Sequence, residues 1–300
     1  MADQFRFGIG EWYGKSFIHL TLAERQALCR PARDNRLAQP LCLPRLTMDY
    51  NQRCTKKGGV CSIRKYVLFE NQNVSIAGTP ITTCPHRFNE GNLVFQWASE
   101  HVLKHHNPLI VREVGFLERL PSRNNEDEEK ANGKPVGKID MVLVHPEMER
   151  LSWCALEMQA VYFSGDSMNG DFITIANFEE SGVPFPSGKR RPDYRSSGPK
   201  RLMPQLQIKV PTLRRWGKKM VVVVDESFFR ALGPMAYEND ITNCDIVWLI
   251  VGYNEEGDQA TMNLRGFRFT TLDRAIEGLT AGNPVTLNEF ENRIRTKLGG

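Results

Sequence analysis

The sequence contains no apolar run long enough to cross a membrane. A transmembrane helix needs about 18 or more consecutive apolar residues, and the 300-residue chain has no such stretch. Its first residues do not combine a basic start with an apolar segment, so no secretory signal peptide is predicted. Internal repeats and low-complexity tracts are also missing. We therefore expect a cytoplasmic protein without a membrane partner, built as one large domain or as a core with a smaller appendage.

The chain as a whole has little net charge, but its charged residues are unevenly distributed. The net charge is only +4, whereas residues 189–219 hold eleven Lys or Arg and one acid. This segment therefore carries +10 and the rest of the chain −6. A basic stripe on an otherwise acidic protein is typical of a polyanion partner such as nucleic acid. The alternative is a solvated basic loop.

The cysteines lack the C-x₂-C pairs of a standard zinc ribbon. Five of the seven nevertheless fall within the first 84 residues, and Cys42, Cys54, Cys61 and Cys84 are separated by 11, 6 and 22 residues. In a cytoplasmic protein such a cluster favours metal binding over disulfides. Thiolates accept either iron or zinc, so the residue type leaves the metal open. The other possibility is a set of free thiols.

The pattern along the chain predicts three parts. Residues 1–28 form an N-terminal arm with a short helix, residues 29–90 form an irregular cysteine-rich subdomain, and residues 91–300 form the main domain. In the main domain, apolar spacing predicts helices over 93–105, 272–279 and 287–298, and strands over 109–117, 136–144, 153–163, 220–224, 246–251 and 263–269. This order is typical of an α/β fold with a mixed central sheet flanked by helices.

Three polar residues interrupt the apolar strands of the main domain. Asp140 lies in Lys138–Val144, and Glu157 and Gln159 lie two residues apart on the next strand, so their side chains point to one face. Two adjacent strands would bring Asp140 beside Glu157, and the two carboxylates would repel each other unless a cation lay between them. Hard oxygen ligands with open positions suit Mg²⁺. Solvent-facing residues at strand ends are the alternative.

This constellation resembles the PD-(D/E)xK nuclease superfamily, in which a mixed sheet carries Asp and then Glu-x-Lys. Gln159 departs from the usual Lys, since a neutral amide can orient a water but cannot stabilise charge as lysine does. A closer resemblance is to the NotI-like restriction endonucleases. It rests on the four cysteines with their neighbours, on Ile139-Asp140-Met141, on Leu156-Glu157-Met158-Gln159 and on Lys200-Arg201, within roughly residues 40–220.

The resemblance implies a PD-(D/E)xK nuclease core with an N-terminal metal-binding subdomain built on the four cysteines. It implies a homodimer that makes Mg²⁺-dependent double-strand cuts by phosphodiester hydrolysis in a short GC-rich palindromic DNA site. It also implies one structural iron on the four cysteines, and a further catalytic acid at Glu113, which is otherwise an exposed strand acid. A non-catalytic, metal-stabilised regulator that binds a specific DNA sequence would share the basic stripe and the cysteines without needing the carboxylates.

The candidate DNA contacts are the basic residues of the cysteine-rich and basic segments. Guanine is recognised best by arginine or lysine, but a contact to phosphate or a solvated charge is an open alternative for each of them. The set is Arg53, Lys56, Lys57, Lys189, Arg190, Arg191, Arg195, Lys200 and Arg201.

Overall fold

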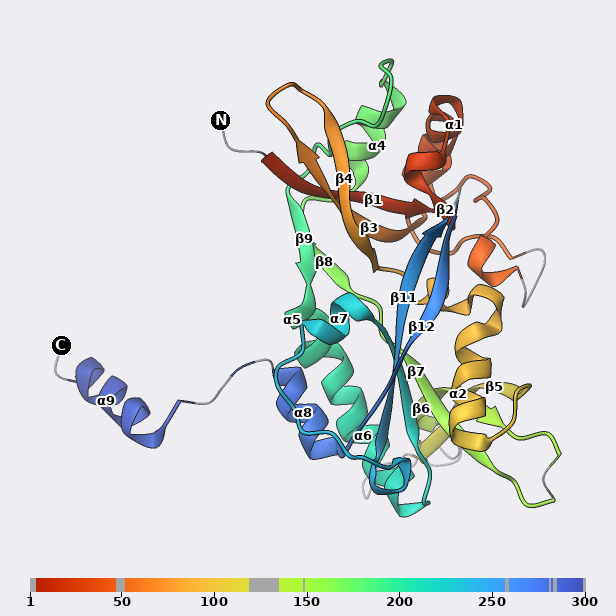
Figure 1. Cartoon of the computed structure of the whole chain (residues 1–300), viewed down its shortest axis with the longest axis vertical. Helices are drawn as coiled ribbons and strands as arrows, with labels where there is room; N and C mark the ends of the chain where they lie inside the picture. The colour runs from red at the N-terminus through yellow and green to blue at the C-terminus, as the bar shows by residue number, and fades with distance from the viewer. Residues whose placement is uncertain are drawn as a thin grey trace, which may run out of the picture.

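The computed structural model describes residues 4–46, 52–118, 135–147, 149–256, 259–280, 282 and 285–298. The acidic, polar composition of residues 122–134 predicts a loop, and this segment lies outside the described residues. Two sheets dominate the described part, one at each end of an elongated body (Figure 1).

The larger sheet has six strands in the order β12-β11-β10-β7-β6-β5. β10 runs parallel to both β7 and β11, and the other pairs are antiparallel, so the sheet is mixed as predicted. The strands are β5 (Leu109–Glu118), β6 (Pro135–Val144), β7 (Trp153–Met158), β10 (Met220–Asp225), β11 (Ile246–Glu256) and β12 (Gln259–Thr270).

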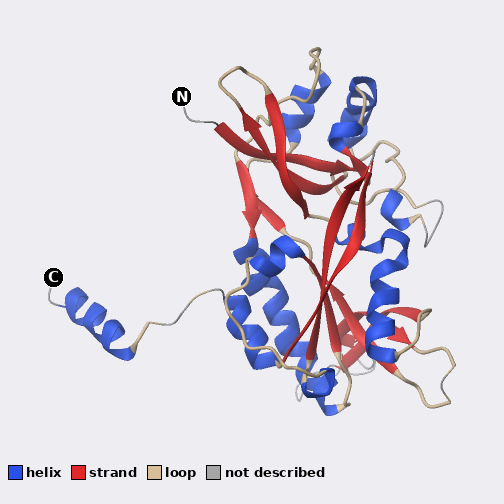
Figure 2. Ribbon diagram, viewed as in Figure 1, coloured by secondary structure: helices blue, strands red, loops and turns tan. Residues whose placement is uncertain are grey.

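Helices cover both faces of the larger sheet (Figure 2). On one face, α2 (Leu93–Leu103) packs against Val221 and Val223 of β10. On the other face, α6 (Met203–Arg215) and α8 (Leu272–Thr280) pack against Val222 and Val224. Alternate residues of β10 therefore enter opposite layers, which explains why this central strand is an unbroken apolar run.

The smaller sheet is antiparallel, in the order β2-β1-β3-β4. Its strands are β1 (Gln4–Trp12), β2 (Lys15–Ser16), β3 (Val60–Leu68) and β4 (Val74–Thr82). The expectation that the cysteine-rich segment is irregular throughout is therefore wrong for residues 60–82. The strand pattern of β3 was hidden by Ser62 and Arg64, which are buried polar residues; the Arg64 guanidinium donates to the Gly78 carbonyl at 3.0 Å.

The remaining elements connect or flank the two sheets. The helices are α1 (Leu22–Arg33), α4 (Asn169–Ala176), α5 (Tyr194–Ser197), α7 (Glu226–Arg230) and α9 (Leu287–Leu298). The short helical turns are η1 (Phe17–His19), η2 (Leu43–Arg45), η3 (Pro85–Asn92), η4 (Gly198–Leu202) and η5 (Ile241–Asn243), and β8 (Tyr162–Gly165) pairs with β9 (Arg190–Asp193) as a separate ribbon.

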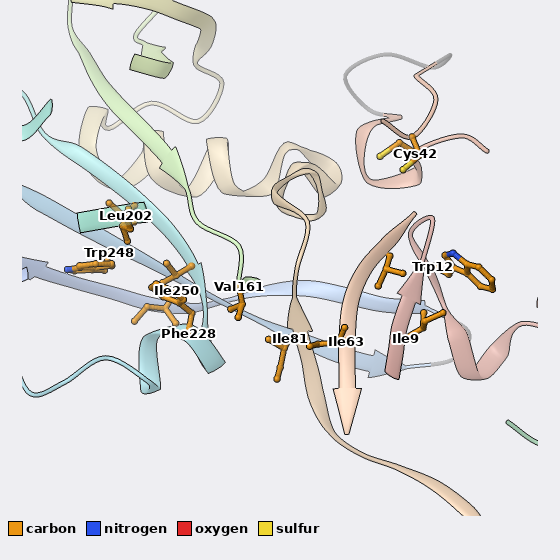
Figure 3. Close-up of a cluster of buried hydrophobic side chains, with 14 of the residues drawn as sticks. Ile9, Trp12, Cys42, Ile63, Ile81, Val161, Leu202, Phe228, Trp248 and Ile250 are labelled. Carbon is orange, nitrogen blue, oxygen red and sulfur yellow. The ribbon is translucent and has the colours of Figure 1, made fainter. Parts of the chain in front are cut away.

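One hydrophobic core runs through both sheets. Ile9, Ile63 and Ile81 of the smaller sheet belong to the same buried cluster as Ile250 and Trp248 of the larger sheet (Figure 3). The domain boundaries at residues 28 and 90 stay predictions. The predicted arm, residues 1–28, contains β1, and β1 pairs with β3 along most of its length. The N-terminal residues are thus an integral part of the smaller sheet.

A buried arginine, Arg87, joins the two sheets. The Arg87 guanidinium contacts the Glu11 carboxylate of β1 at 2.8 Å and donates to the Ala260 carbonyl of β12 at 2.6 Å. It also lies over the Tyr253 ring of β11 at 4.7 Å. Burying a charge is costly unless it is paired, so this pair fixes the position of η3 between the sheets.

Candidate active site

The two predicted carboxylates lie side by side in the larger sheet. β6 and β7 pair antiparallel with Met141 opposite Leu156, so the next register step brings Asp140 level with Glu157. The Glu157 side chain is 7% exposed and that of Asp140 is 53% exposed. One carboxylate is therefore held inside the protein and the other stands at the edge of an open space.

A lysine that the sequence analysis missed bridges this pair. Lys209 Nζ lies 2.7 Å from Glu157 Oε2 and 3.3 Å from Asp140 Oδ2. A third contact, at 2.9 Å, is to Gln205 Oε1, one helical turn earlier on α6. Lys209 falls on the same buried face of α6 as Leu206 and Val210, and a charged residue on an apolar helix face is the signal that sequence reasoning could have used.

The helix that carries Lys209 begins with an irregular turn. A proline inside a helix removes a backbone hydrogen bond, so Pro204 and Pro211 predict a kinked or split helix in this segment. The π-helical turn η4 does precede α6, and Pro204 lies in the first turn of α6, where a missing N–H removes no helical hydrogen bond. The helix nevertheless continues through Pro211. An unbroken α6 thus holds Gln205 and Lys209 in fixed register over the carboxylates.

Burial raises the pKa of Glu157 to about 7, and the negative charge of Asp140 adds to the rise. The Lys209 ammonium acts in the opposite direction and lowers this pKa. The single lysine therefore does not fully offset the combined effect of the burial of Glu157 and the neighbouring charge of Asp140. A carboxyl poised near neutral pH in a cleft is a common property of functional sites.

The carboxylates open into a cavity of about 480 Å³ that is bounded by β5, β6 and β7 of the larger sheet, by η3 and by the start of α6. Gln159 lines it together with Glu157, as their spacing predicted, and the Gln159 amide donates to the Ala160 carbonyl at 2.5 Å. The lining also includes basic and polar groups from segments far apart in the sequence: Lys56, Thr83, His86, Asn89, Arg112, Tyr162, Arg201 and Gln205. The cavity is thus acidic at its floor and basic around it.

Glu113 lies outside this cavity. The register of β5 and β6 places it level with Asp140, but its backbone has a positive φ of 54° and its side chain is 72% exposed. Its carboxylate pairs with Lys138 Nζ at 3.0 Å instead of facing Glu157. Its catalytic role stays a prediction.

The structure separates the predicted DNA contacts by exposure. Arg190 is buried: its guanidinium forms an ion pair with Asp171 and donates to the carbonyls of Phe7, Asp166 and Ser167. These partners make it a structural residue, which corrects the prediction of a DNA contact for Arg190. By contrast, Lys189, Arg191, Arg195 and Lys200 are exposed.

The other predicted contacts lie nearer the cavity. Arg201 stacks on the Tyr162 ring at 3.7 Å and donates to its hydroxyl at 2.9 Å. Lys56 lines the cavity and donates to the Thr83 carbonyl. Arg53 and Lys57 are exposed, and Arg53 donates to the Gln39 carbonyl at 2.6 Å.

The four cysteines are buried as two pairs held by backbone hydrogen bonds. Cys42 and Cys54 flank an isolated bridge between Leu41 and Arg53, and the Cys84 N–H donates to the Cys61 carbonyl at 3.1 Å. Within the described residues, no group of three or more His, Cys, Asp or Glu side chains is arranged to hold a metal ion. The thiols of Cys54 and Cys61 instead point to the backbone carbonyls of Lys56 and Gly59, both at 3.7 Å.

The thiols are nevertheless close enough to affect one another. A hydrogen bond with Cys54, followed by burial and the charges of Cys61 and Cys84, raises the pKa of the Cys42 thiol far above its usual range. The same hydrogen bond lowers the pKa of Cys54 to about 7. All seven cysteines are free.

The site thus combines one buried and one half-exposed carboxylate, a bridging lysine and a basic rim on a mixed sheet. A model of the family described as restriction endonuclease NotI matches residues 27–264. The chain therefore belongs to the NotI restriction endonuclease family, which makes it a site-specific deoxyribonuclease and not the non-catalytic alternative. A search of curated proteins finds no match to the chain.

None of the helices among the described residues has the length and apolar character needed to cross a membrane.

Proposed function

We propose that this protein is a type II restriction endonuclease that hydrolyses DNA phosphodiesters at the Asp140–Glu157–Lys209 cluster with Mg²⁺. One observation carries the proposal. At the floor of an open cavity, the Lys209 ammonium group lies within 3.3 Å of both the Asp140 and the Glu157 carboxylate. Membership of the restriction endonuclease family supports the substrate class.

The donor set fits magnesium. Two carboxylates, one buried and one half exposed, offer hard oxygen atoms, and Mg²⁺ typically takes one or two protein carboxylates and leaves further positions for water and phosphate oxygens. Asp140 and Glu157 would hold the ion. When bound, it would polarise the phosphate and lower the pKa of a coordinated water.

The remaining groups act on charge and orientation. Lys209 supplies the positive charge that the neutral Gln159 lacks, and it favours the ionised form of Glu157 by opposing the effect of burial. Gln159 faces the same cavity and can orient a water molecule through its amide oxygen, since its Nε2 donates to Ala160. In this proposal the lysine function of the superfamily motif is supplied from α6 and not from β7.

We further propose that a homodimer binds a short GC-rich palindrome in double-stranded DNA. A two-fold axis matches a palindromic site, because each subunit then meets one half-site. Arg191, Arg195, Lys200 and Arg201 follow the catalytic strands and are exposed, which makes them available to phosphates and bases. The exposed Arg53 and Lys57 and the cavity residue Lys56 approach from the cysteine-rich segment.

A structural iron or zinc on Cys42, Cys54, Cys61 and Cys84 is also part of the proposal. Four buried free thiols with mutual effects on their pKa are chemically suited to such a metal. Binding would require the Cys54 and Cys61 thiols to turn away from their present carbonyl partners. The metal would stabilise the loop that carries Arg53 and Lys57.

Incubation with plasmid DNA tests the activity. We expect discrete fragments in Mg²⁺ and none in EDTA, and mapping of the fragment ends gives the site and the cut position. Glu157→Gln is the matched control, because it keeps the side-chain volume and removes one charge. Random degradation, or equal cleavage by the Glu157→Gln variant, would contradict the proposal.

A further inference from the structure

The C-terminal helix α9 stands apart from the body of the protein (Figure 1), and none of its residues is buried. Four large apolar side chains are nevertheless exposed on it: Leu287, Phe290, Ile294 and Leu298. They recur at intervals of three or four residues, so they form one stripe along the helix. An apolar stripe on an otherwise polar helix indicates a surface that packs against a partner.

The length of α9 supports the same conclusion. It has 12 residues, and an isolated helix shorter than about 12–15 residues is marginal in water. Thr286 and Glu289 form a reciprocal cap at its start, which stabilises the first turn. A cap gives only about 1 kcal/mol, so a helix with this stripe gains most from covering its apolar side.

The charges of α9 show which partner fits. Its first half carries Glu289 and Glu291, and its second half carries Arg293, Arg295 and Lys297. The helix is therefore acidic at one end and basic at the other. A second copy of the same helix, laid antiparallel, places the acidic half of each against the basic half of the other, whereas a parallel copy places like charges together.

We propose that α9 packs antiparallel against α9 of a second copy of this chain and forms part of the subunit contact. With the two-fold axis near the middle of the helix, Leu287 lies opposite Leu298 of the partner subunit, and Phe290 lies opposite Ile294 of the partner subunit. Within each helix, Glu291 is already paired with Arg295 of its own chain at 3.4 Å. The antiparallel arrangement adds attraction between the acidic half of one helix and the basic half of the other, and it does so while the apolar stripes face each other.

The proposal rests on the homodimer proposed above and adds where the subunits meet. Two helices of this length cover only part of the roughly 1,200 Å² or more that a stable dimer buries. The α9 pair is therefore one component of the contact, and its loss weakens the dimer without unfolding the subunit.

Sedimentation of the DNA-free protein over a concentration series tests the apolar stripe. We expect Phe290→Asp with Ile294→Asp to raise the dimer dissociation constant about tenfold or more, because it places unpaired charges in the contact. Asn288→Asp with Asn292→Asp adds the same charge on the other side of the helix, and it should leave the dissociation constant unchanged. Both variants should keep the wild-type melting temperature.

Charge reversal tests the antiparallel direction. Arg293→Glu with Lys297→Glu should weaken the dimer, because it places acids against the acidic half of the partner helix. If the Phe290 and Ile294 double variant dimerises like wild type, α9 is not the contact. If that variant instead lowers the melting temperature of the monomer, α9 packs on its own chain. A wild-type protein that is monomeric at every concentration would overturn the homodimer itself, while DNA cleavage would still test the nuclease.

Discussion

Replacement of Lys209 by methionine should destabilise the protein and abolish cleavage. The Lys209 and Glu157 side chains are each 7% exposed and lie 2.7 Å apart. Methionine keeps the aliphatic length but leaves the Glu157 carboxylate buried without its counter-charge. Breaking a buried pair by removing one partner typically costs about 3–5 kcal/mol, and Asp140 beside it adds repulsion in the same direction.

The cost should depend on pH, because Glu157 can take up a proton. Its pKa is raised from 4.5 to about 7 in the folded protein, so between these values the folded state binds the proton more tightly than the unfolded chain. The free energy of unfolding therefore falls as pH rises through this range. Loss of Lys209 raises the pKa of Glu157 further and extends this fall to higher pH. Near pH 5 Glu157 is already protonated, and the variant should lose about 1 kcal/mol or less.

Urea unfolding at about pH 5 and pH 8 measures this difference, with about 3 kcal/mol lost at the higher pH. Lys200→Met is the stability control, because Lys200 is exposed on the turn before the same helix. Lys209→Met with Glu157→Gln removes both charges and should recover most of the stability at pH 8. Cleavage by Lys209→Met should fall at least about 100-fold, or about 2.7 kcal/mol in activation free energy. A loss of stability that is equal at both pH values, or full cleavage activity, would refute the reasoning.

Further variants test the other parts of the site. Asp140→Asn should abolish cleavage while Ca²⁺-supported DNA binding persists, as measured by gel shift; cleavage at the wild-type rate would remove it from the site. Cys54→Ser should lower both the bound transition metal and the melting temperature, since metal binding contributes to folding; active protein free of transition metal would rule the site out. Arg190→Ala should reduce stability by about 3–5 kcal/mol in urea unfolding, because it leaves a buried acid unpaired. Arg191→Ala or Arg195→Ala should leave stability unchanged, and at least one of them should cost about 1–3 kcal/mol in affinity for the cognate duplex and little for a scrambled one.

The larger sheet could be predicted because its elements follow simple periodicities. Apolar runs gave β10 and β11 to within a few residues, and helical spacing gave α2 and α9. The smaller sheet could not be predicted, because β1 pairs with β3 far along the sequence, from Gln4 opposite Leu68 to Trp12 opposite Val60, and buried polar side chains such as Arg64 break the strand pattern. The hydrogen-bonding groups of those side chains find their partners only in the tertiary fold.

The residues of the site also fall into those that the sequence predicts and those that it does not. Asp140, Glu157 and Gln159 were found because they interrupt apolar strands that neighbour each other in sequence and in space. Lys209 comes from a helix about fifty residues later and reaches the carboxylates only when α6 packs on the sheet. Arg190 could not be distinguished from Arg191 by sequence, since only the partner Asp171 on α4 determines which of the two is buried.

The hydrophobic core that runs through both sheets determines how the subunit unfolds. Because Ile63 and Ile250 belong to one buried cluster, and Arg87 ties Glu11 to the β11–β12 hairpin, the two sheets should unfold in a single cooperative transition. A subunit with intact carboxylates but a melted smaller sheet should therefore be rare. Damage to the smaller sheet would then unfold the whole subunit and would not leave a folded catalytic half behind.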